Sequence, residues 1–188
     1  MVRAIFQTRE FEERFLKIGM GYRVIGGTKF YERAEIKDAV AFLRIVNQKN
    51  DDLAFERIIN VPKRSVGDST IKQLYNWARK NQKSLEDSAI ELLQLNKIKP
   101  KTKLGLIKIL KLFSKWRSDL KEKKHYELME IILDESGYSK MLKDKKDLES
   151  EGRLENLKNF LFQLLSSYKS TDRHHLHNKY YYFFLKVN

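Results

Sequence analysis

Cysteine is absent from this chain of 188 residues, and proline occurs only twice. The lack of cysteine excludes a disulfide scaffold and a zinc site with thiolate ligands, and it fits a reducing compartment. No apolar run approaches the ~20 residues that a membrane-spanning helix needs. The first residues, MVRAIFQTREFEERF, lack the apolar stretch of a secretory signal and are too acidic for a transit peptide. We therefore expect a soluble, cytoplasmic protein with no membrane partner.

Positive charge is in clear excess, with 38 Lys+Arg against 25 Asp+Glu and a formal net charge of +13. Such an excess attracts polyanions, and nucleic acid is the first candidate. The cations are concentrated between Lys97 and Lys124, where eleven of them stand against Asp119 and Glu122 alone. An AT-rich genome also fills protein surfaces with lysine, so charge by itself leaves that explanation open.

The first 48 residues have a different pattern from the rest of the chain. Apolar spacing predicts a short helix over 7–18 and a longer one over about 31–48. Between them, GYRVIGG at 21–27 alternates and has glycines at its ends, which is typical of a short strand. One strand cannot form a sheet by itself. This segment is therefore interpreted as part of an α/β domain.

From residue 49 onward the pattern is helical. The predicted helices begin with one that Asp51 caps and Pro62 ends, and they continue at about 68–80, 85–95, 101–123, 125–135 and 148–168. The last residues have no helical period and contain YYYFF, a β-prone run. We therefore predict a mainly α protein, with a partial α/β segment at 1–48, an all-α helical bundle at 49–169 and a divergent tail at 170–188.

The stretch NVPKRSVGDSTI at 60–71 predicts a helix-hairpin-helix element. One helix ends near Pro62, the chain turns at Gly67, and the next helix begins near Asp68. The free N–H groups at such a helix start attract an anion, and glycine lets that anion approach the backbone closely. The side chains that would surround a phosphate are Lys63, Arg64, Ser65, Ser69 and Thr70. This pattern indicates contact with nucleic-acid backbone without base reading, although simple helix capping by Asp68 or Ser65 remains an alternative.

Four stretches of the chain carry a family resemblance: FQTREFEERFLKIGMGYRVIGGTKFYERAEIKDAVAFLRIV, DDLAFERIINVPKRSVGDSTI, SGYSKMLKD and EGRLENLKNFL. In this order they closely resemble superfamily 1 DNA helicases of the UvrD/PcrA/Rep type, over residues 2 to about 168. The resemblance implies a RecA-like domain 2A segment at 1–48, carrying motif IV, and a 2B-like subdomain at 49–169. It implies a function in ATP-dependent 3′ to 5′ DNA unwinding, with ATP and Mg²⁺ as the cofactors of the full-length family.

The resemblance also implies roles for single residues. Arg3 matches the motif IV arginine that reaches the γ-phosphate of ATP, and this is the one catalytic position the chain offers. The hairpin matches the GIG element by which 2B holds the DNA duplex, with Gly67 and Thr70 at contact positions. The first glycine of that element is Ser65 here, followed by Val66. A side chain at Ser65 would keep a phosphate farther from the backbone, which predicts a weaker grip.

The motifs of an ATP site are missing from this sequence. It contains no GxxxxGK[ST] phosphate loop and no Asp-Glu pair after a strand to hold Mg²⁺. We therefore expect no ATPase activity and no cofactor from this chain alone, with DNA, the remaining helicase domains or repair proteins as partners. Three alternatives stay open: a stand-alone DNA-binding module, a protein-interaction module, and a non-functional relic of a split helicase gene.

Three other groups of residues have plainer explanations than a site. The histidines of RHHLHN at 173–178 could bind a metal, but a chance cluster is favoured, and no metal site is predicted. Glu32, Glu35 and Asp38 share a helical face that we expect to be solvated. Four aromatic residues could stack on bases but are expected mostly in the core: Tyr75, Trp77, Phe113 and Trp116.

Overall fold

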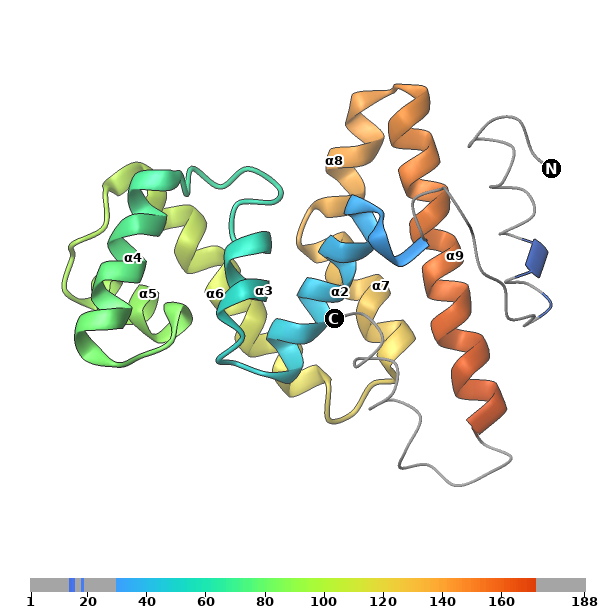
Figure 1. Ribbon diagram of the computed structural model, residues 1–188, viewed down its shortest axis with the longest axis horizontal. Coiled ribbons are helices and arrows are strands. Elements are labelled where there is room, and N and C mark those ends of the chain that lie inside the picture. Colours follow the sequence, from blue (N-terminus) through green and yellow to red (C-terminus); the bar gives the residue numbers. More distant parts are fainter. Residues whose placement is uncertain (1–13, 16–17, 19–29, 172–188) are drawn as a thin grey trace. The chain divides into compact units, whose positions relative to one another are not determined.

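The computed structural model describes residues 14–15, 18 and 30–171, and in this part of the chain all regular structure is helical (Figure 1). The mainly α class predicted from the sequence is confirmed there. The predicted strand at 21–27, most of the predicted helix at 7–18 and residues 172–188 lie outside the described residues. The assignment of the first segment to a RecA-like domain therefore stays a prediction.

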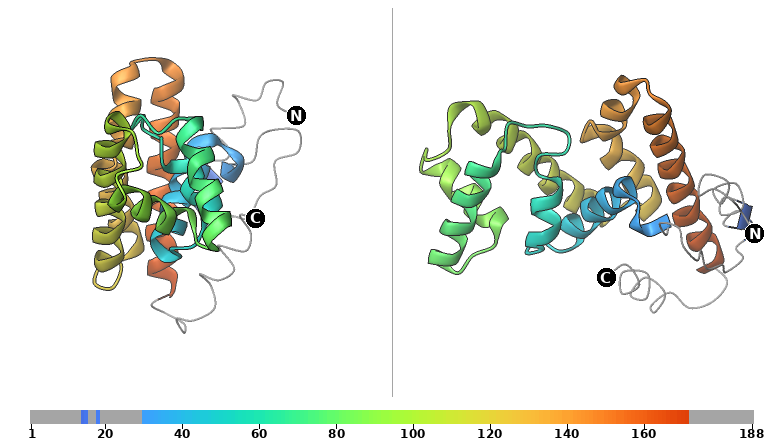
Figure 2. Two further views of the ribbon diagram at one scale, coloured as in Figure 1. Left: turned by 90° about the vertical axis from the view of Figure 1, so that its left-hand side faces the viewer. Right: turned by 45° about the horizontal axis from the view of Figure 1, so that its top comes forward.

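The helices follow the predicted order. They are η1 (Phe30–Glu32), α2 (Ala34–Asn47), α3 (Asp52–Ile58), α4 (Asp68–Asn81), α5 (Leu85–Gln94), α6 (Pro100–Asp119), α7 (His125–Glu135), α8 (Tyr138–Lys145) and α9 (Leu148–Thr171). The chain forms two compact units, one from Met1–Lys37 with Gly152–Asn188 and the other from Asp38–Glu151. Within the second unit α4 packs on α5, and α6 leads from this pair to α7 (Figure 2).

Local sequence signals set the helix boundaries. Asp51 accepts a hydrogen bond from the N–H of Ala54, and Ser84 accepts one from Asp87, so the predicted cap at Asp51 is confirmed. Helix α8 is not among the helices predicted from the sequence, and it follows Gly137 directly. The backbone of Gly137 is left-handed, with φ of +80°, and the chain turns there and starts α8 at once.

An aromatic cluster holds the second unit together. Phe42 from α2, Phe55 from α3, Phe113 and Trp116 from α6, and Tyr138 from α8 are all buried. Ring centroids lie 5.9–6.2 Å apart, and three of the four ring pairs meet edge to face. The predicted core positions of Phe113 and Trp116 are confirmed. Four helices therefore share one apolar centre, and α6 supplies two of its rings.

Of the three acidic residues predicted to form a solvated face, Glu32 in η1 is exposed as predicted, whereas Glu35 and Asp38 are not. Glu35 is only 4% exposed, and its carboxylate accepts a hydrogen bond from Asn156, within the first unit. Asp38, in the second unit, accepts hydrogen bonds of 2.7 Å from the Tyr138 hydroxyl and the Arg57 guanidinium. The prediction was wrong for both residues because their partners lie 19 to 121 positions away, beyond the reach of a helical pattern.

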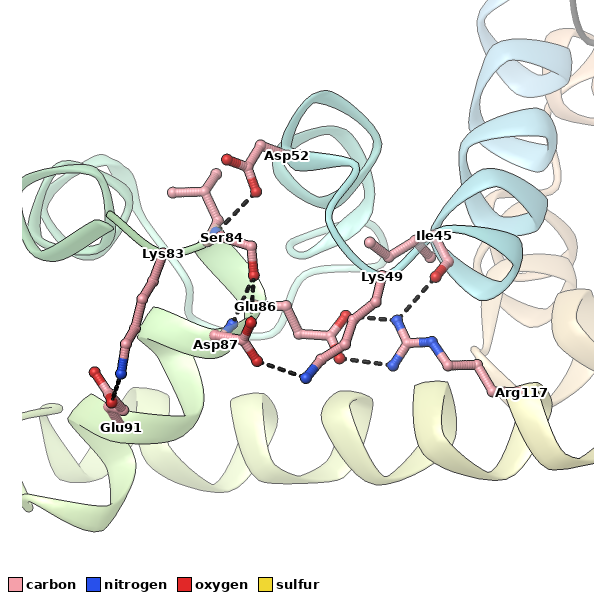
Figure 3. A network of polar contacts seen from close by, with 10 residues as sticks. Ile45, Lys49, Asp52, Lys83, Ser84, Glu86, Asp87, Glu91 and Arg117 are labelled. Carbon is pink, nitrogen blue, oxygen red and sulfur yellow. Dashed lines mark hydrogen bonds and ion pairs between the residues drawn. The ribbon is translucent and has the colours of Figure 1, made fainter. Parts of the chain in front are cut away.

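A buried ion pair joins three helices of the second unit (Figure 3). The Arg117 guanidinium of α6 donates to both carboxylate oxygens of Glu86 in α5, at 2.7 and 2.6 Å, and to the carbonyl of Ile45 in α2 at 2.8 Å. Glu86 is 2% exposed. Buried carboxylates need such pairing, because an unpaired charge in the interior is strongly unfavourable. The more exposed pair of Lys49 and Asp87 lies beside it.

We expect Arg117→Ala to lower the free energy of unfolding by about 3–5 kcal/mol, because it leaves the Glu86 carboxylate buried without its partner. The control is Lys49→Ala, which removes an exposed pair and should cost about 1 kcal/mol or less. Urea unfolding followed by circular dichroism measures both. Equal losses of unfolding free energy in the two variants would show that the buried pair stabilises the protein no more than the exposed pair does.

Candidate nucleic-acid interface

We use the name hairpin for residues 60–71, which comprise most of the loop between α3 and α4 together with the first residues of α4. Its fold depends on Asn60, whose side-chain oxygen accepts hydrogen bonds from the N–H groups of Arg64 at 2.8 Å and Val66 at 3.2 Å. The Val66 side chain is buried and anchors the loop to the protein. These two contacts turn the backbone back on itself, so that α4 begins directly after Gly67.

The hairpin is fixed to the first turns of α6. The Thr102 hydroxyl donates a hydrogen bond of 2.7 Å to the carbonyl of Ser65. At Gly105 an added Cβ would lie 2.5 Å from the Arg64 carbonyl oxygen, so only glycine allows the loop to come this close. Sequence reasoning did not select either residue. The one available signal was a glycine inside an otherwise regular helical pattern, which often marks a close backbone approach.

Arg64 points its guanidinium into the protein rather than toward a ligand. Nη1 donates to the carbonyls of Ile58 at 3.1 Å, Ile59 at 3.3 Å and Pro62 at 3.0 Å, and Nη2 donates to Ser136 at 3.0 Å. Burial lowers the pKa of this guanidinium to about 10, so it is still charged at neutral pH. In this position Arg64 connects the end of α3 with the residue that follows α7. These four hydrogen bonds engage Nη1 and Nη2, and the predicted contact of Arg64 with phosphate stays a prediction.

The other predicted contact residues divide between surface and interior. Lys63, Ser65, Gly67 and Ser69 are exposed, whereas Thr70 is buried. The structure thus brings one cation, one glycine and two hydroxyls to the outer side of the hairpin. Burial of Thr70 at the start of α4 makes it a packing residue as well as a predicted contact position.

The backbone at the start of α4 is open. Gly67 is the N-cap and has no side chain to cap the helix; the N–H of Thr70 donates to the Gly67 carbonyl at 2.9 Å, and the N–H groups of Asp68 and Ser69 form no hydrogen bond with a described residue. An added Cβ at Gly67 would meet nothing within 4 Å, and its φ of −92° is one that any residue adopts. Neither internal packing nor backbone conformation therefore demands a glycine at this position. Partial positive charge at the helix start favours an anion there.

Several cations of the basic run have partners inside the protein. The Lys97 ammonium lies 4.6 Å from the centre of the Trp77 ring, and Lys103 donates to Asn96 at 2.7 Å. Arg117 is in the buried pair described above. The ring of Trp77 is thus in contact with the ammonium of Lys97. The predicted core position is wrong for Tyr75, which is 37% exposed and whose pKa is raised to about 12, chiefly by its hydrogen bond to a carboxylate of α3.

Metal-ligand clusters are not found in the described part of the chain. Among those residues no three histidine, cysteine, aspartate or glutamate side chains converge as metal ligands. Arg3 and the histidines at 173–178 lie outside the described residues. Across 30–171, no helix has both the length and the apolar character needed to cross a membrane.

Comparison with known proteins gives consistent matches over most of the chain. A family model for the UvrD-like helicase C-terminal domain matches residues 1–183. A probable DNA helicase II homolog of Rickettsia conorii is 40% identical over 161 residues, which are 86% of this chain and 25% of that protein. The ATP-dependent DNA helicase PcrA of Staphylococcus aureus is 40% identical over 158 residues, 82% of this chain and 21% of its own length. The chain thus spans about a quarter of the length of these relatives.

We expect Arg64→Ala to lower the free energy of unfolding by about 2 kcal/mol or more, because it removes the hydrogen bonds that Arg64 donates to four carbonyls, of which that of Ile58 keeps the N–H of Val61 as a second donor. Arg64→Lys should recover only part of this, since an ammonium lacks the planar fork of a guanidinium. Lys63→Ala is the control and should change stability by about 0.5 kcal/mol or less. Urea unfolding gives all three values. If Arg64→Ala proved as mild as Lys63→Ala, the supporting role would be wrong.

Proposed function

The chain belongs to the family of UvrD-like helicase C-terminal domains, and we propose that it acts in a UvrD-type, ATP-dependent helicase that unwinds DNA with 3′ to 5′ polarity. Two proteins that it matches are named as DNA helicases. The formal charge of +13 supports DNA as the partner. In this proposal the chain supplies contact with the duplex, and other parts of the enzyme supply the phosphate loop.

The hairpin is the part of this chain that holds the duplex, and Gly67 is the observation that supports this role most directly. Nothing inside the protein requires glycine at that position, and the space beside it is open. A glycine that the fold does not need is explained by a ligand that approaches the backbone from outside. An anionic ligand suits the free N–H groups of the helix start.

A phosphate of the duplex backbone is the anion that fits best. It would accept hydrogen bonds from the N–H groups at the start of α4 and from the Ser69 hydroxyl, with Lys63 as the nearby full charge. Such contacts position a protein on DNA without reading its bases. Arg64 supports the loop from within, so the grip relies on one cation rather than two.

Arg3 retains its proposed role at the γ-phosphate of ATP, which it would perform only in the presence of a phosphate loop. That loop is missing from this sequence. When bound, ATP and Mg²⁺ would supply the energy for unwinding. The residues described here would then keep the duplex in place during that cycle.

The hairpin is tested by fluorescence anisotropy of residues 1–188 with a DNA duplex that carries a single-stranded tail, over a salt series. The slope of log affinity against log salt is negative, because salt weakens the binding of DNA. We expect Lys63→Ala to make this slope shallower by about 0.9, the value for one phosphate contact. Ser65→Gly should raise affinity instead, because it lets a phosphate approach the backbone more closely.

The matched control is Lys80→Ala, which removes an exposed lysine near the other end of α4. It should leave the slope within the error of the unchanged protein. Equal slopes for the Lys63 and Lys80 variants would mean that charge in general, and not the hairpin, binds the DNA. If the unchanged chain shows no binding at low salt, the proposed function itself fails.

We also expect the purified chain to release no phosphate from ATP above the background, with or without DNA, because it has no phosphate loop. A coupled phosphate-release assay measures this. Turnover that Arg3→Ala abolishes would overturn the expectation, whereas turnover that survives this substitution would indicate a contaminating enzyme.

A further inference from the structure

A row of lysines runs along the outer face of α6, and we call it the lysine stripe: Lys101, Lys108 and Lys111, with Leu104 between the first two. All four side chains are exposed, and Leu104 is 77% exposed. Their spacing of three and four residues places them on one side of the helix. From Lys101 to Lys111 the stripe is about 15 Å long, at roughly 1.5 Å per helical residue.

The charges of the lysine stripe are not neutralised within the described part of the protein. The sequence has no aspartate or glutamate between residues 92 and 118, so no acidic neighbour exists one helical turn away. Lys115, the next lysine on this face, is paired with Glu135. Lys101, Lys108 and Lys111 form no ion pair or side-chain hydrogen bond with the described residues. These three lysines are thus the cations of α6 that have no partner among the described residues.

This arrangement is unfavourable for the isolated helix. Like charges at a spacing of three residues repel each other, as at Lys108 and Lys111. The N-terminus of α6 has no acidic residue in its first turn and no side-chain cap at Lys99, although cations are disfavoured at the positive end of a helix. An anion along this face removes both penalties. A row of anions removes them along the whole stripe.

We propose that the lysine stripe is a second contact surface for the phosphate backbone of duplex DNA, beyond the hairpin. The stripe is as long as four or five phosphates of one strand, which follow each other at about 3.4 Å along the duplex axis. It would accept any sequence, because lysine binds phosphate as a point charge. This inference rests on the proposed function, since it extends the same contact with DNA.

A duplex suits the stripe better than an anionic membrane does. Helices that lie on membranes insert an apolar face into the lipid. The apolar face of α6 is already used, because Leu106, Ile109, Phe113 and Trp116 are fully buried in the protein. Only Leu104 remains exposed beside the lysines, which is far too little for insertion.

The hairpin lies beside the lysine stripe, so that both could hold the same duplex. Thr102 and Gly105, which hold the hairpin, belong to the same turns of α6 as Lys101 and Leu104. The hairpin therefore packs against the same turns of α6 that carry the first part of the lysine stripe. A duplex held by both would be fixed in direction as well as in place, which a single hairpin contact cannot do.

The test compares two triple variants of residues 1–188 in the same duplex assay. The first is Lys101→Gln/Lys108→Gln/Lys111→Gln, and the second is Lys140→Gln/Lys143→Gln/Lys145→Gln on α8. Both remove three exposed lysines without described partners, so their change in net charge is identical. We expect the first to make the salt slope shallower by about 2.7, at roughly 0.9 for each phosphate contact, and the second to make it shallower by less than about 0.9. Unfolding midpoints in urea verify that both variants are folded.

Each other outcome overturns the inference in a distinguishable way. Equal loss in the two triple variants would show that only net charge matters. An unchanged slope in the stripe variant, while Lys63→Ala still makes it shallower, would limit the contact to the hairpin and leave the proposed function intact. No binding by the unchanged chain would remove both. If the stripe variant lost binding to phosphatidylserine vesicles and kept its binding to DNA, the stripe would be a membrane contact.

Discussion

The half-buried guanidinium of Arg64 is the constraint on which the geometry of the hairpin depends. It binds the carbonyls of Ile58, Ile59 and Pro62 around the end of α3, together with that of Ser136 after α7. Carbonyl groups at a helix end carry partial negative charge, so a cation there is favourable as well as hydrogen-bonded. Arg64 therefore supports the loop from within, whereas the neighbouring Lys63 and Ser65 are exposed.

Helix α6 contacts a different part of the protein on each of its faces, and one face is exposed. Phe113 and Trp116 enter the aromatic cluster, and Arg117 completes the buried pair with Glu86. Gly105 leaves room for the backbone of the hairpin. The remaining face is basic and exposed. A helix fixed so firmly on its inner side offers surface cations at constant positions, which an isolated basic helix would not.

The sequence predicted most of this fold and only part of the candidate site. Apolar spacing and caps located α2 to α7 and α9 within a few residues, because those signals are local, and the family resemblance is confirmed by the comparison. The loop between α3 and α4 could be located for the same reason, whereas its assignment as a helix-hairpin-helix element stays a prediction. The inward direction of Arg64 could not, since one of its acceptors lies 72 positions away. The burial of Glu35 could not be predicted for a similar reason, because its partner Asn156 lies 121 positions away. Patterns within one helix carry no information about such contacts.

Three glycines differ in whether contacts or backbone conformation within the protein explain them. Gly137 has a left-handed backbone, and Gly105 touches another chain segment, so each is explained within the protein. Gly67 has neither reason. Ser65 presents the reverse case, because its φ of +59° lies where glycine is favoured and a side chain is strained. The hairpin thus tolerates strain at Ser65 while it keeps an unneeded glycine two residues later. In the proposed contact with DNA, this contrast favours the start of α4 over Ser65 as the point where a phosphate comes closest to the backbone.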